Sequence, residues 1–186
     1  MRVSTALATF FLSFSLASPS ASHGGPGGPD RDIQPDVYEA IHQRESILAL
    51  TLDTKDWAHL GDSVTKDVVY DSRPLGPDYG GLSVGLEQLI QNSKAAFGNA
   101  RVGHHVSNAV IKLNRDATQA NVTTYIVYSR WDLSAPHDVK KSFRIFERCD
   151  DVFVVDDGTW KLKHSLVTNL APGAEALNLD AGRKHN

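Results

Sequence analysis

The stretch LDTKDWAHL, residues 52–60, contains a carboxylate, Asp53, at the point where an amphipathic helical pattern ends. About fifty residues later the chain contains VGHHVSN, residues 102–108, in which two adjacent histidines lie within a run that favours a strand. Histidine is the side chain that most readily exchanges protons near neutral pH. These two stretches are the clearest indications of fold and chemistry in the sequence.

A helical pattern precedes the first stretch. Asp36 and Glu39 have the spacing of a capping box, and apolar residues at helical spacing follow them, which predicts a helix over 36–52. A short second helix is expected between residues 54 and 63, and a strand over 65–71. A third helix is expected after Ser83, which is a candidate cap, because residues at helical spacing follow it: Leu86, Leu89, Ile90, Ser93 and Phe97.

Beyond the third helix the hydrophobic pattern changes to a period of two, which is typical of strands. Strands are predicted at 101–113, 119–131, 140–155 and 159–169. Asp156-Asp157-Gly158 is a strong hairpin signal between the last two strands, and residues 114–117 form another predicted turn. Helices followed by consecutive antiparallel strands indicate an α+β fold.

Both ends of the chain are expected to lie outside this domain. Residues 1–22 have the pattern of a secretory signal peptide, with cleavage between residues 17 and 22. Residues 23–35 are rich in Gly and Pro and are predicted to be a flexible leader, and residues 171–186 a mobile tail. The folded domain is therefore expected over 36–170, in a protein that is secreted.

The composition argues against several classes of protein. The net charge is −3, from 19 basic and 22 acidic residues without a long block of either sign, which argues against binding to nucleic acid or to an anionic membrane. Cys149 is the single cysteine, so no disulfide can form within the chain. The sequon that begins at Asn121 predicts N-glycosylation of the exported protein if this residue is exposed.

The period of two also assigns an inward face to each strand. In the last strand Lys161 and Lys163 mark the solvent side. The residues that alternate with them are therefore expected to face inward, namely Trp160, Leu162, His164 and Leu166. In the second long strand, if Asn121 is exposed, the residues on the opposite, inner side are Val122, Thr124, Ile126 and Tyr128. In the first long strand one face is shared by Val102, His104, Val106 and Val110. The predicted cavity wall is therefore largely apolar.

Each of these assignments has a structural alternative. A histidine on an apolar face is often a hydrogen-bonded core residue rather than a catalyst, which applies to His104 and to His164. Tyr128 also fits a place in the wall of the domain. Tyr70, at the end of the predicted first strand, also fits the start of the turn that follows.

Several chemistries have no support in the sequence. Adjacent residues of a strand point to opposite faces, so His104 and His105 cannot chelate one metal ion together. The chain has no HExxH or paired-cysteine motif, so no metal is expected. It has no GxSxG, P-loop or GxGxxG motif either, so neither serine-hydrolase nor nucleotide-dependent chemistry is indicated, and no cofactor is expected.

Over residues 36–170 the sequence resembles the scytalone dehydratase and SnoaL-like members of the NTF2-like superfamily. LDTKDWAHL is similar to the segment of scytalone dehydratase in which an aspartate ends the first helix, and VGHHVSN is similar to the strand that carries a catalytic histidine. The resemblance implies that Asp53 and His104 are a catalytic acid/base pair. It also implies an NTF2-like cone, in which about three N-terminal helices pack on a curved mixed or antiparallel sheet and enclose a pocket.

The resemblance extends to the residues of the pocket. Tyr128 lies close to the position of a further pocket histidine in scytalone dehydratase, and Cys149 lies near that of a pocket asparagine. Together with Tyr70 and with the inward-facing Trp160 and His164, they are the predicted substrate-binding residues.

The sequence also departs from scytalone dehydratase. Leu52 and Ser72 stand at or near the positions of two tyrosines that hold a water on the substrate carbonyl in that enzyme, so scytalone is not the expected substrate. The broader SnoaL-like group, with cyclases, dehydratases and isomerases of polyketide and terpenoid pathways, fits better. We expect a secreted, cofactor-free lyase or isomerase of dehydratase or cyclase type that acts on a small apolar metabolite and can form a homodimer. The alternative is a secreted protein of the same fold that binds a small molecule without catalysis.

Overall fold

A computed structural model of the chain describes residues 35–171 and 175–176. The predicted signal peptide, residues 23–34 of the predicted leader and most of the predicted tail lie outside the described residues. No helix in the described part of the chain is both long enough and apolar enough to cross a membrane.

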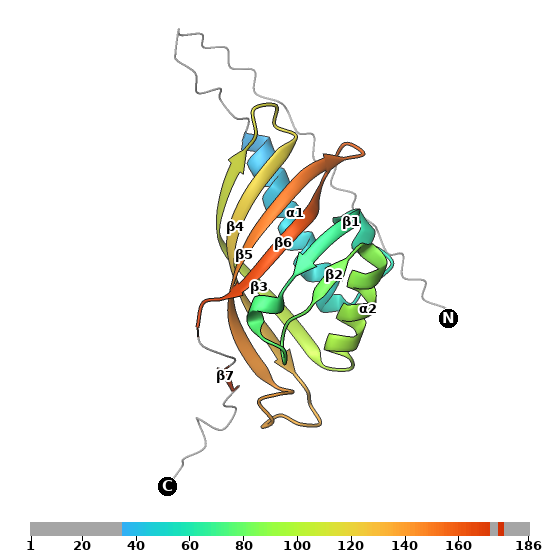
Figure 1. Cartoon of the computed structure of the whole chain (residues 1–186), viewed down its shortest axis with the longest axis vertical. Coiled ribbons are helices and arrows are strands. Elements are labelled where there is room, and N and C mark those ends of the chain that lie inside the picture. The colour runs from blue at the N-terminus through green and yellow to red at the C-terminus, as the bar shows by residue number, and fades with distance from the viewer. Residues whose placement is uncertain (1–34, 172–174, 177–186) are drawn as a thin grey trace, which may run out of the picture. The chain divides into compact units, whose positions relative to one another are not determined.

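The described chain forms two α-helices, two short 3-10 helices and seven strands (Figure 1). The helices are α1 (Pro35–Thr54), η1 (Leu60–Asp62), η2 (Arg73–Leu75) and α2 (Leu86–Phe97). The strands are β1 (Val64–Asp71), β2 (Leu82–Val84), β3 (Arg101–Leu113), β4 (Gln119–Trp131), β5 (Phe143–Asp156), β6 (Thr159–Asn169) and β7 (Glu175–Ala176). The α+β class is confirmed, as are the bounds predicted for β3, β4 and β6.

The strands form one curved, mixed sheet in the order β2-β1-β6-β5-β4-β3, and β7 pairs with β5 off this path. β1 and β6 are parallel, and the other described pairs are antiparallel. The predicted hairpin between β5 and β6 turns at Asp157 and Gly158, whose φ angles of 51° and 73° are those that a type I′ turn requires. α1 crosses one face of the sheet and contacts β3 and β6, while α2 contacts β1 and β2 (Figure 1).

The structure has one α-helix fewer than predicted. α1 ends in a Schellman motif, because Lys55 has a φ of 58°, its N–H donates to the carbonyl of Leu52, and the N–H of Asp56 donates to the carbonyl of Thr51. The residues after this motif, predicted as a second helix, form turns and the short 3-10 helix η1, because their backbone hydrogen bonds mostly join residues three apart.

The predicted third helix is α2, but its start differs from the prediction. Gly85 is the N-cap, with a φ of 87°, and its backbone carbonyl accepts the N–H of Leu89. Ser83, the predicted cap, lies in β2 opposite Tyr70 of β1. The sequence therefore places this helix correctly but misses the short strand before it.

The core lies between α1 and the inner face of the sheet. One cluster of buried side chains includes Ile41 of α1, Leu60 of η1 and Phe153 of β5, together with Trp160. A second cluster includes Phe97, Tyr128, Ile145 and Cys149. The inward face predicted for β4 is confirmed, since the buried residues on it include Val122, Thr124 and Tyr128.

A β-bulge in β3 overturns one predicted face. The pairing of β3 with β4 shifts between Ser107 and Val110, where Asn108 has a φ of 55°. The extra residue reverses the alternation of side chains, so Val110 faces solvent with 56% of its surface exposed. Ile111 takes the inward position and packs against the core.

A second bulge, in β6, makes the inward orientation predicted for His164 wrong. Val152 of β5 pairs with His164, whereas the next residue, Phe153, pairs with Leu162, so β6 contains one extra residue at this point. Beyond the bulge Ser165 is buried and His164 is exposed.

Candidate active site

The two residues of the predicted acid/base pair come from α1 and β3. Asp53 lies in the last turn of α1, two residues before the residue with positive φ that ends the helix. His104 is the fourth residue of β3 and lies opposite Tyr128 of β4. α1 packs against β3, so the end of the helix and this part of the strand are neighbours.

Asp53 accepts two hydrogen bonds from His104. Its Oδ1 is 2.6 Å from Nδ1 of the imidazole ring, and its Oδ2 is 3.1 Å from the backbone nitrogen. Both side chains are largely enclosed, with 10% of His104 and 22% of Asp53 exposed. The contact predicted from the sequence is therefore present. A carboxylate beside Nδ1 favours the tautomer with the proton on that nitrogen, which leaves Nε2 as the nitrogen that can accept a proton.

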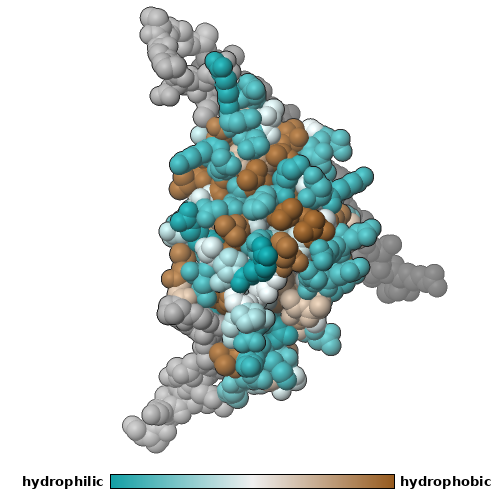
Figure 2. Space-filling model, viewed as in Figure 1, coloured by the Kyte–Doolittle hydropathy of each residue, from teal (hydrophilic) through white to brown (hydrophobic). Residues whose placement is uncertain are grey.

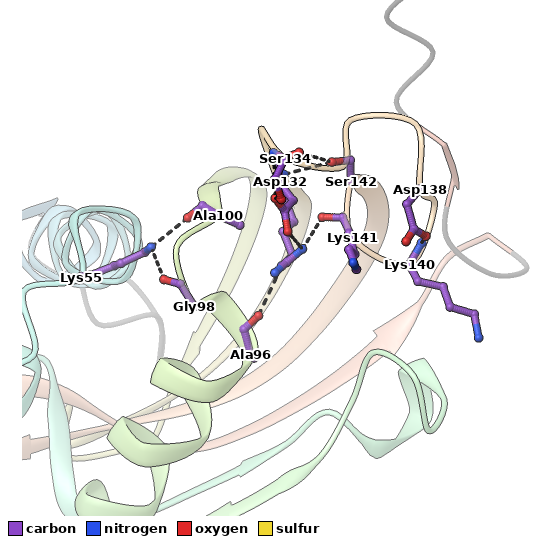
Figure 3. Close-up of polar contacts among 11 residues, drawn as sticks. Lys55, Ala96, Gly98, Ala100, Asp132, Ser134, Asp138, Lys140, Lys141 and Ser142 are labelled. Atoms are coloured by element: carbon purple, nitrogen blue, oxygen red, sulfur yellow. Dashed lines mark hydrogen bonds and ion pairs between the residues drawn. The ribbon is translucent and has the colours of Figure 1, made fainter.

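Lys55 joins the end of α1 to the loop between α2 and β3 (Figure 3). Its Nζ donates hydrogen bonds to the backbone carbonyls of Gly98 at 2.7 Å and Ala100 at 2.8 Å. This loop leads directly into the strand that carries His104. Lys55 thus ties the end of α1, where Asp53 lies, to the start of the strand that carries His104.

Aromatic rings surround His104. The ring centroid of Tyr128 lies 4.9 Å from that of the imidazole, and the centroid of Phe97 lies 6.1 Å from it. Trp57, which follows α1, packs against Phe97. Burial raises the pKa of the Tyr128 hydroxyl well above its usual value, so this group is neutral and can donate a hydrogen bond.

His104 lines a cavity between α1 and the sheet. The cavity is small, with a volume of about 40 Å³, and it is partly open to solvent. Its wall is mainly apolar and includes Leu48, Leu52, Val106, Ile126, Phe153 and Leu162. A wall of this kind suits a small, largely apolar ligand.

The predicted substrate-binding residues lie in different places. Tyr70 and Cys149 line the cavity. Tyr128 is buried against His104 but is not one of the lining residues, and Trp160 is buried in the core around Phe153.

Two further predicted positions lie at the surface. His164 is exposed and outside the cavity, which removes the geometric basis for its predicted role. Asn121 is exposed, so the condition set for its glycosylation is met.

Sequence reasoning missed three carboxyl groups in the interior: Glu45 of α1 and Glu147 of β5 are buried, and Asp151 of β5 is half-buried. Burial raises the pKa of Glu45 and of Asp151 to about 7 and that of Glu147 to about 8. The negative charge of Asp151 is a second, smaller cause for Glu45. Glu45 and Asp151 line the cavity.

Their positions in the sequence contain a signal. Glu45 lies four residues after Ile41 and four before Ala49, on the apolar stripe of α1. Glu147 and Asp151 alternate with Cys149 on the inward face of β5. In the described residues, no three His, Cys, Asp or Glu side chains are grouped so that they could hold a metal ion.

Comparison with known proteins adds a family match to this geometry. The model of a family described as the SnoaL-like domain matches residues 36–165. Among proteins of curated function, none matches the sequence.

Three solved structures illustrate the similarity of the fold. ActVI-ORFA from Streptomyces coelicolor has a TM-score of 0.59 at 17% sequence identity, and the alignment covers 73% of this chain and 98% of that protein. A protein provisionally named scytalone dehydratase from Novosphingobium aromaticivorans DSM 12444 has a TM-score of 0.57 at 19% identity, with 76% and 95% covered. Aln2 from a Streptomyces species has a TM-score of 0.59 at 12% identity, with 73% and 92% covered. At these identities the similarity establishes the fold alone.

Proposed function

The chain belongs to the SnoaL-like domain family, and from this we propose that it is a lyase or isomerase of the dehydratase or cyclase type. In this proposal His104 and Asp53 are the acid/base pair, and the substrate is a small, largely apolar metabolite of polyketide or terpenoid type. The observation that carries the proposal is the 2.6 Å hydrogen bond between Asp53 Oδ1 and Nδ1 of a histidine that opens into an apolar cavity.

The proposed chemistry starts with proton removal by His104. Asp53 holds the ring with its proton on Nδ1, so Nε2 takes a proton from a substrate carbon that is acidified by a neighbouring carbonyl. The carboxylate of Asp53 then stabilises the imidazolium that forms. A positioned base of this kind contributes about 10²–10⁴-fold to the rate, which is adequate for protons already acidified by conjugation.

The second proton transfer completes either a dehydration or an isomerisation. The imidazolium returns its proton to the leaving oxygen in the first case and to another carbon in the second. Tyr128 is the other candidate donor, because its hydroxyl is neutral and its ring lies 4.9 Å from that of His104. The wall near the reacting carbon is mainly apolar.

Conversion of metabolites by the purified protein tests this proposal. The protein is incubated with a metabolite extract of the producing organism, which is analysed by mass spectrometry before and after. We expect one compound to be converted by the wild type and by His105→Ala, but not by His104→Ala. His105 is a matched control because it is adjacent in sequence and exposed. Conversion at the same rate by folded His104→Ala would contradict the proposal.

Leu52 favours a second candidate function, that of a small-molecule carrier without catalysis. Its side chain lines the cavity with hydrocarbon at the position where scytalone dehydratase has a tyrosine. A compound that copurifies with the protein and is recovered unchanged after incubation would support the carrier.

We also propose that the protein is secreted and glycosylated on Asn121, which is exposed in β4. N-terminal sequencing of the secreted protein should find a first residue within or just after residues 17–22. Endoglycosidase treatment should lower its mass, and Asn121→Gln should abolish that change. An intact Met1 on a protein retained in the cell would contradict export.

A further inference from the structure

A group of oxygen atoms without hydrogen-bond partners lines part of the cavity. Glu45 of α1 is 6% exposed, and Thr124 of β4 is 1% exposed. Both carboxyl oxygens of Glu45, Oγ1 of Thr124 and Oδ1 of Asp151 are buried, and none of them has a partner within the described part of the chain. All three residues line the same cavity, and we call them the polar patch. Buried polar atoms in proteins are normally hydrogen-bonded, so the polar patch calls for a ligand.

The sheet and α1 bring the residues of the polar patch together. Asp151 of β5 pairs with Val122 of β4, two residues before Thr124, so Asp151 and Thr124 are diagonal neighbours on the inner face of the sheet. Diagonal neighbours lie about 7–8 Å apart, a separation that a water molecule bridges by hydrogen bonds to both side chains. Burial, and then the negative charge of Asp151, raise the pKa of Glu45 to about 7, so the two carboxyl groups lie close enough to interact.

The size and the polar groups of the cavity indicate which ligand the polar patch takes in the free protein. A volume of about 40 Å³ has room for about two or three water molecules, since each needs about 10–15 Å³. Buried water typically makes about three hydrogen bonds to polar groups that otherwise lack partners. Water both donates and accepts, so it serves carboxylate oxygens as well as a hydroxyl group. A metal ion is not indicated, because no suitable group of three His, Cys, Asp or Glu side chains exists among the described residues.

His42 connects the polar patch to the surface. It lies three residues before Glu45 in α1, its side chain is 47% exposed, and its Nδ1 is 3.6 Å from Oε2 of Glu45, which is within ion-pair distance. Histidine exchanges protons readily near neutral pH, and a carboxyl group with a pKa of about 7 does so as well. Groups that can carry a proton therefore follow one another from solvent to the cavity.

We propose that the polar patch binds ordered water, and that this water forms a proton path to solvent with Glu45 and His42. A proton from solvent passes to His42, then to the carboxyl group of Glu45, and then to the water held between Thr124 and Asp151. Each carrier takes one proton and gives one, so the path is unchanged after each transfer. The inference goes beyond the proposed function, because it requires no turnover and gives the cavity a source of protons that is separate from His104.

A high-resolution crystal structure of the purified protein tests the binding of water. We expect ordered water within hydrogen-bond distance of Glu45 and Thr124 in wild type. Thr124→Val should lose the water that contacts Thr124, because valine has the shape of threonine without the hydroxyl group. Thr123→Val is the matched control and should keep this water, because Thr123 is adjacent in sequence and donates its hydroxyl to Asp150 instead.

Infrared spectroscopy after rapid mixing with D₂O tests the proton path. A protonated carboxyl group has a carbonyl stretch that shifts when deuterium replaces its proton, and subtraction of the matching Glu45→Gln spectrum isolates the band of Glu45. We expect this band to shift about 10²-fold more slowly in His42→Leu than in wild type, the contribution of one positioned proton carrier. His59→Leu is the control and should exchange at the wild-type rate, because His59 is exposed and contacts Asp56.

The other outcomes are also decisive. A polar patch without water in the wild-type crystal, or with a cation in the place of water, would overturn the inference. So would equal exchange rates in wild type and His42→Leu, or equally slow exchange in His42→Leu and His59→Leu. The absence of a Glu45 band at neutral pH would overturn it as well, because an ionised carboxylate has no proton to pass on. Bound water and exchange that depends on His42, in a protein without turnover, would support this inference and contradict the proposed function.

Discussion

At the scale of single residues, Asp53 connects the fold to the chemistry. Its two carboxylate oxygens accept the ring N–H and the backbone N–H of His104. The backbone bond fixes the distance between the end of α1 and β3, and the ring bond fixes the tautomer of the imidazole. In the proposed function, one side chain therefore serves both stability and proton transfer.

Asp53→Asn should impair both. An amide has one acceptor oxygen, so its NH₂ group would face one of the two donors of His104. We expect the free energy of unfolding to fall by about 1–3 kcal/mol, because a buried donor loses its partner. We expect turnover to fall by about 10²-fold or more. Urea denaturation and an activity assay measure the two effects.

Asp56→Asn is the control for this substitution. Asp56 is an exposed carboxylate in the same stretch that pairs with an exposed histidine, His59. Its replacement should change stability and activity little. If Asp53→Asn behaved in the same way as Asp56→Asn, Asp53 would have no part in the site.

The sequence predicts the pair of Asp53 and His104 in the candidate site but not the buried carboxyl group of Glu45. Asp53 and His104 follow from a carboxylate at a helix end and a histidine on a strand. Glu45 escapes prediction because a single acid in an amphipathic helix is normally assigned to the solvent side. Its position between Ile41 and Ala49 on the apolar stripe is the signal that identifies it.

At the scale of elements, Lys55 holds α1 against the loop that leads into β3. It donates to two backbone carbonyls, those of Gly98 and Ala100 (Figure 3). Lys55→Met should lower the free energy of unfolding by about 1–2 kcal/mol, since two charge-assisted hydrogen bonds are lost and the apolar stem is kept. Turnover should fall as well, because the strand that carries His104 is less firmly placed.

Chemical denaturation of Lys55→Met beside Lys94→Met tests this role. Lys94 is an exposed lysine near the end of α2, so its replacement should change little. A Lys55→Met protein as stable as the Lys94→Met protein would show that the two hydrogen bonds hold nothing in place.

The bounds of elements are more predictable than their faces. The period of two in the sequence is enough to place β3, β4 and β6, because it depends on neighbouring residues of one strand. A β-bulge depends on how two strands pair, and no pattern in the residues that form it predicts it. The faces predicted for Val110 and His164 are wrong for this reason.

At the scale of the whole molecule, buried carboxyl groups make stability depend on pH. The folded-state pKa is about 7 for Glu45 and Asp151 and about 8 for Glu147, against usual values of 4.5 for Glu and 3.8 for Asp. Between those usual values and pH 8, the folded protein binds more protons than the unfolded chain. The free energy of unfolding therefore falls as pH rises through this window.

Each group lowers the free energy of unfolding by at most about 1.4 kcal/mol per pH unit. Melting temperatures measured from about pH 5 to about pH 8 should therefore fall. Glu147→Gln should make the decline less steep. Asp71→Asn should leave it unchanged, because hydrogen bonding to Arg73 lowers the pKa of Asp71 to about 2. A melting temperature that rises with pH over this range would contradict the assignment.

The surface of the sheet bears on assembly. Large apolar side chains of β3, β4 and β5 are exposed, namely Val110, Tyr125 and Val155. Figure 2, drawn in the same orientation as Figure 1, shows hydrophobic patches between hydrophilic ones. The homodimer expected from the family resemblance stays a prediction, and sedimentation of the purified protein would decide it.

Glu45 and Asp53 are placed relative to each other by a single helix, α1, which limits how this architecture can be redesigned. Inserting one residue between Glu45 and Asp53 would rotate one of them by about 100° around the helix axis and displace it by about 1.5 Å, so that either Glu45 would leave the cavity or Asp53 would lose its hydrogen bonds to His104. Only insertions or deletions of about seven residues, close to two full turns, would preserve the directions of both side chains. Each would change the separation of the two residues by about 10 Å. A designer who wants a different substrate size should therefore exchange the side chains of the wall and keep the residue count of α1 unchanged.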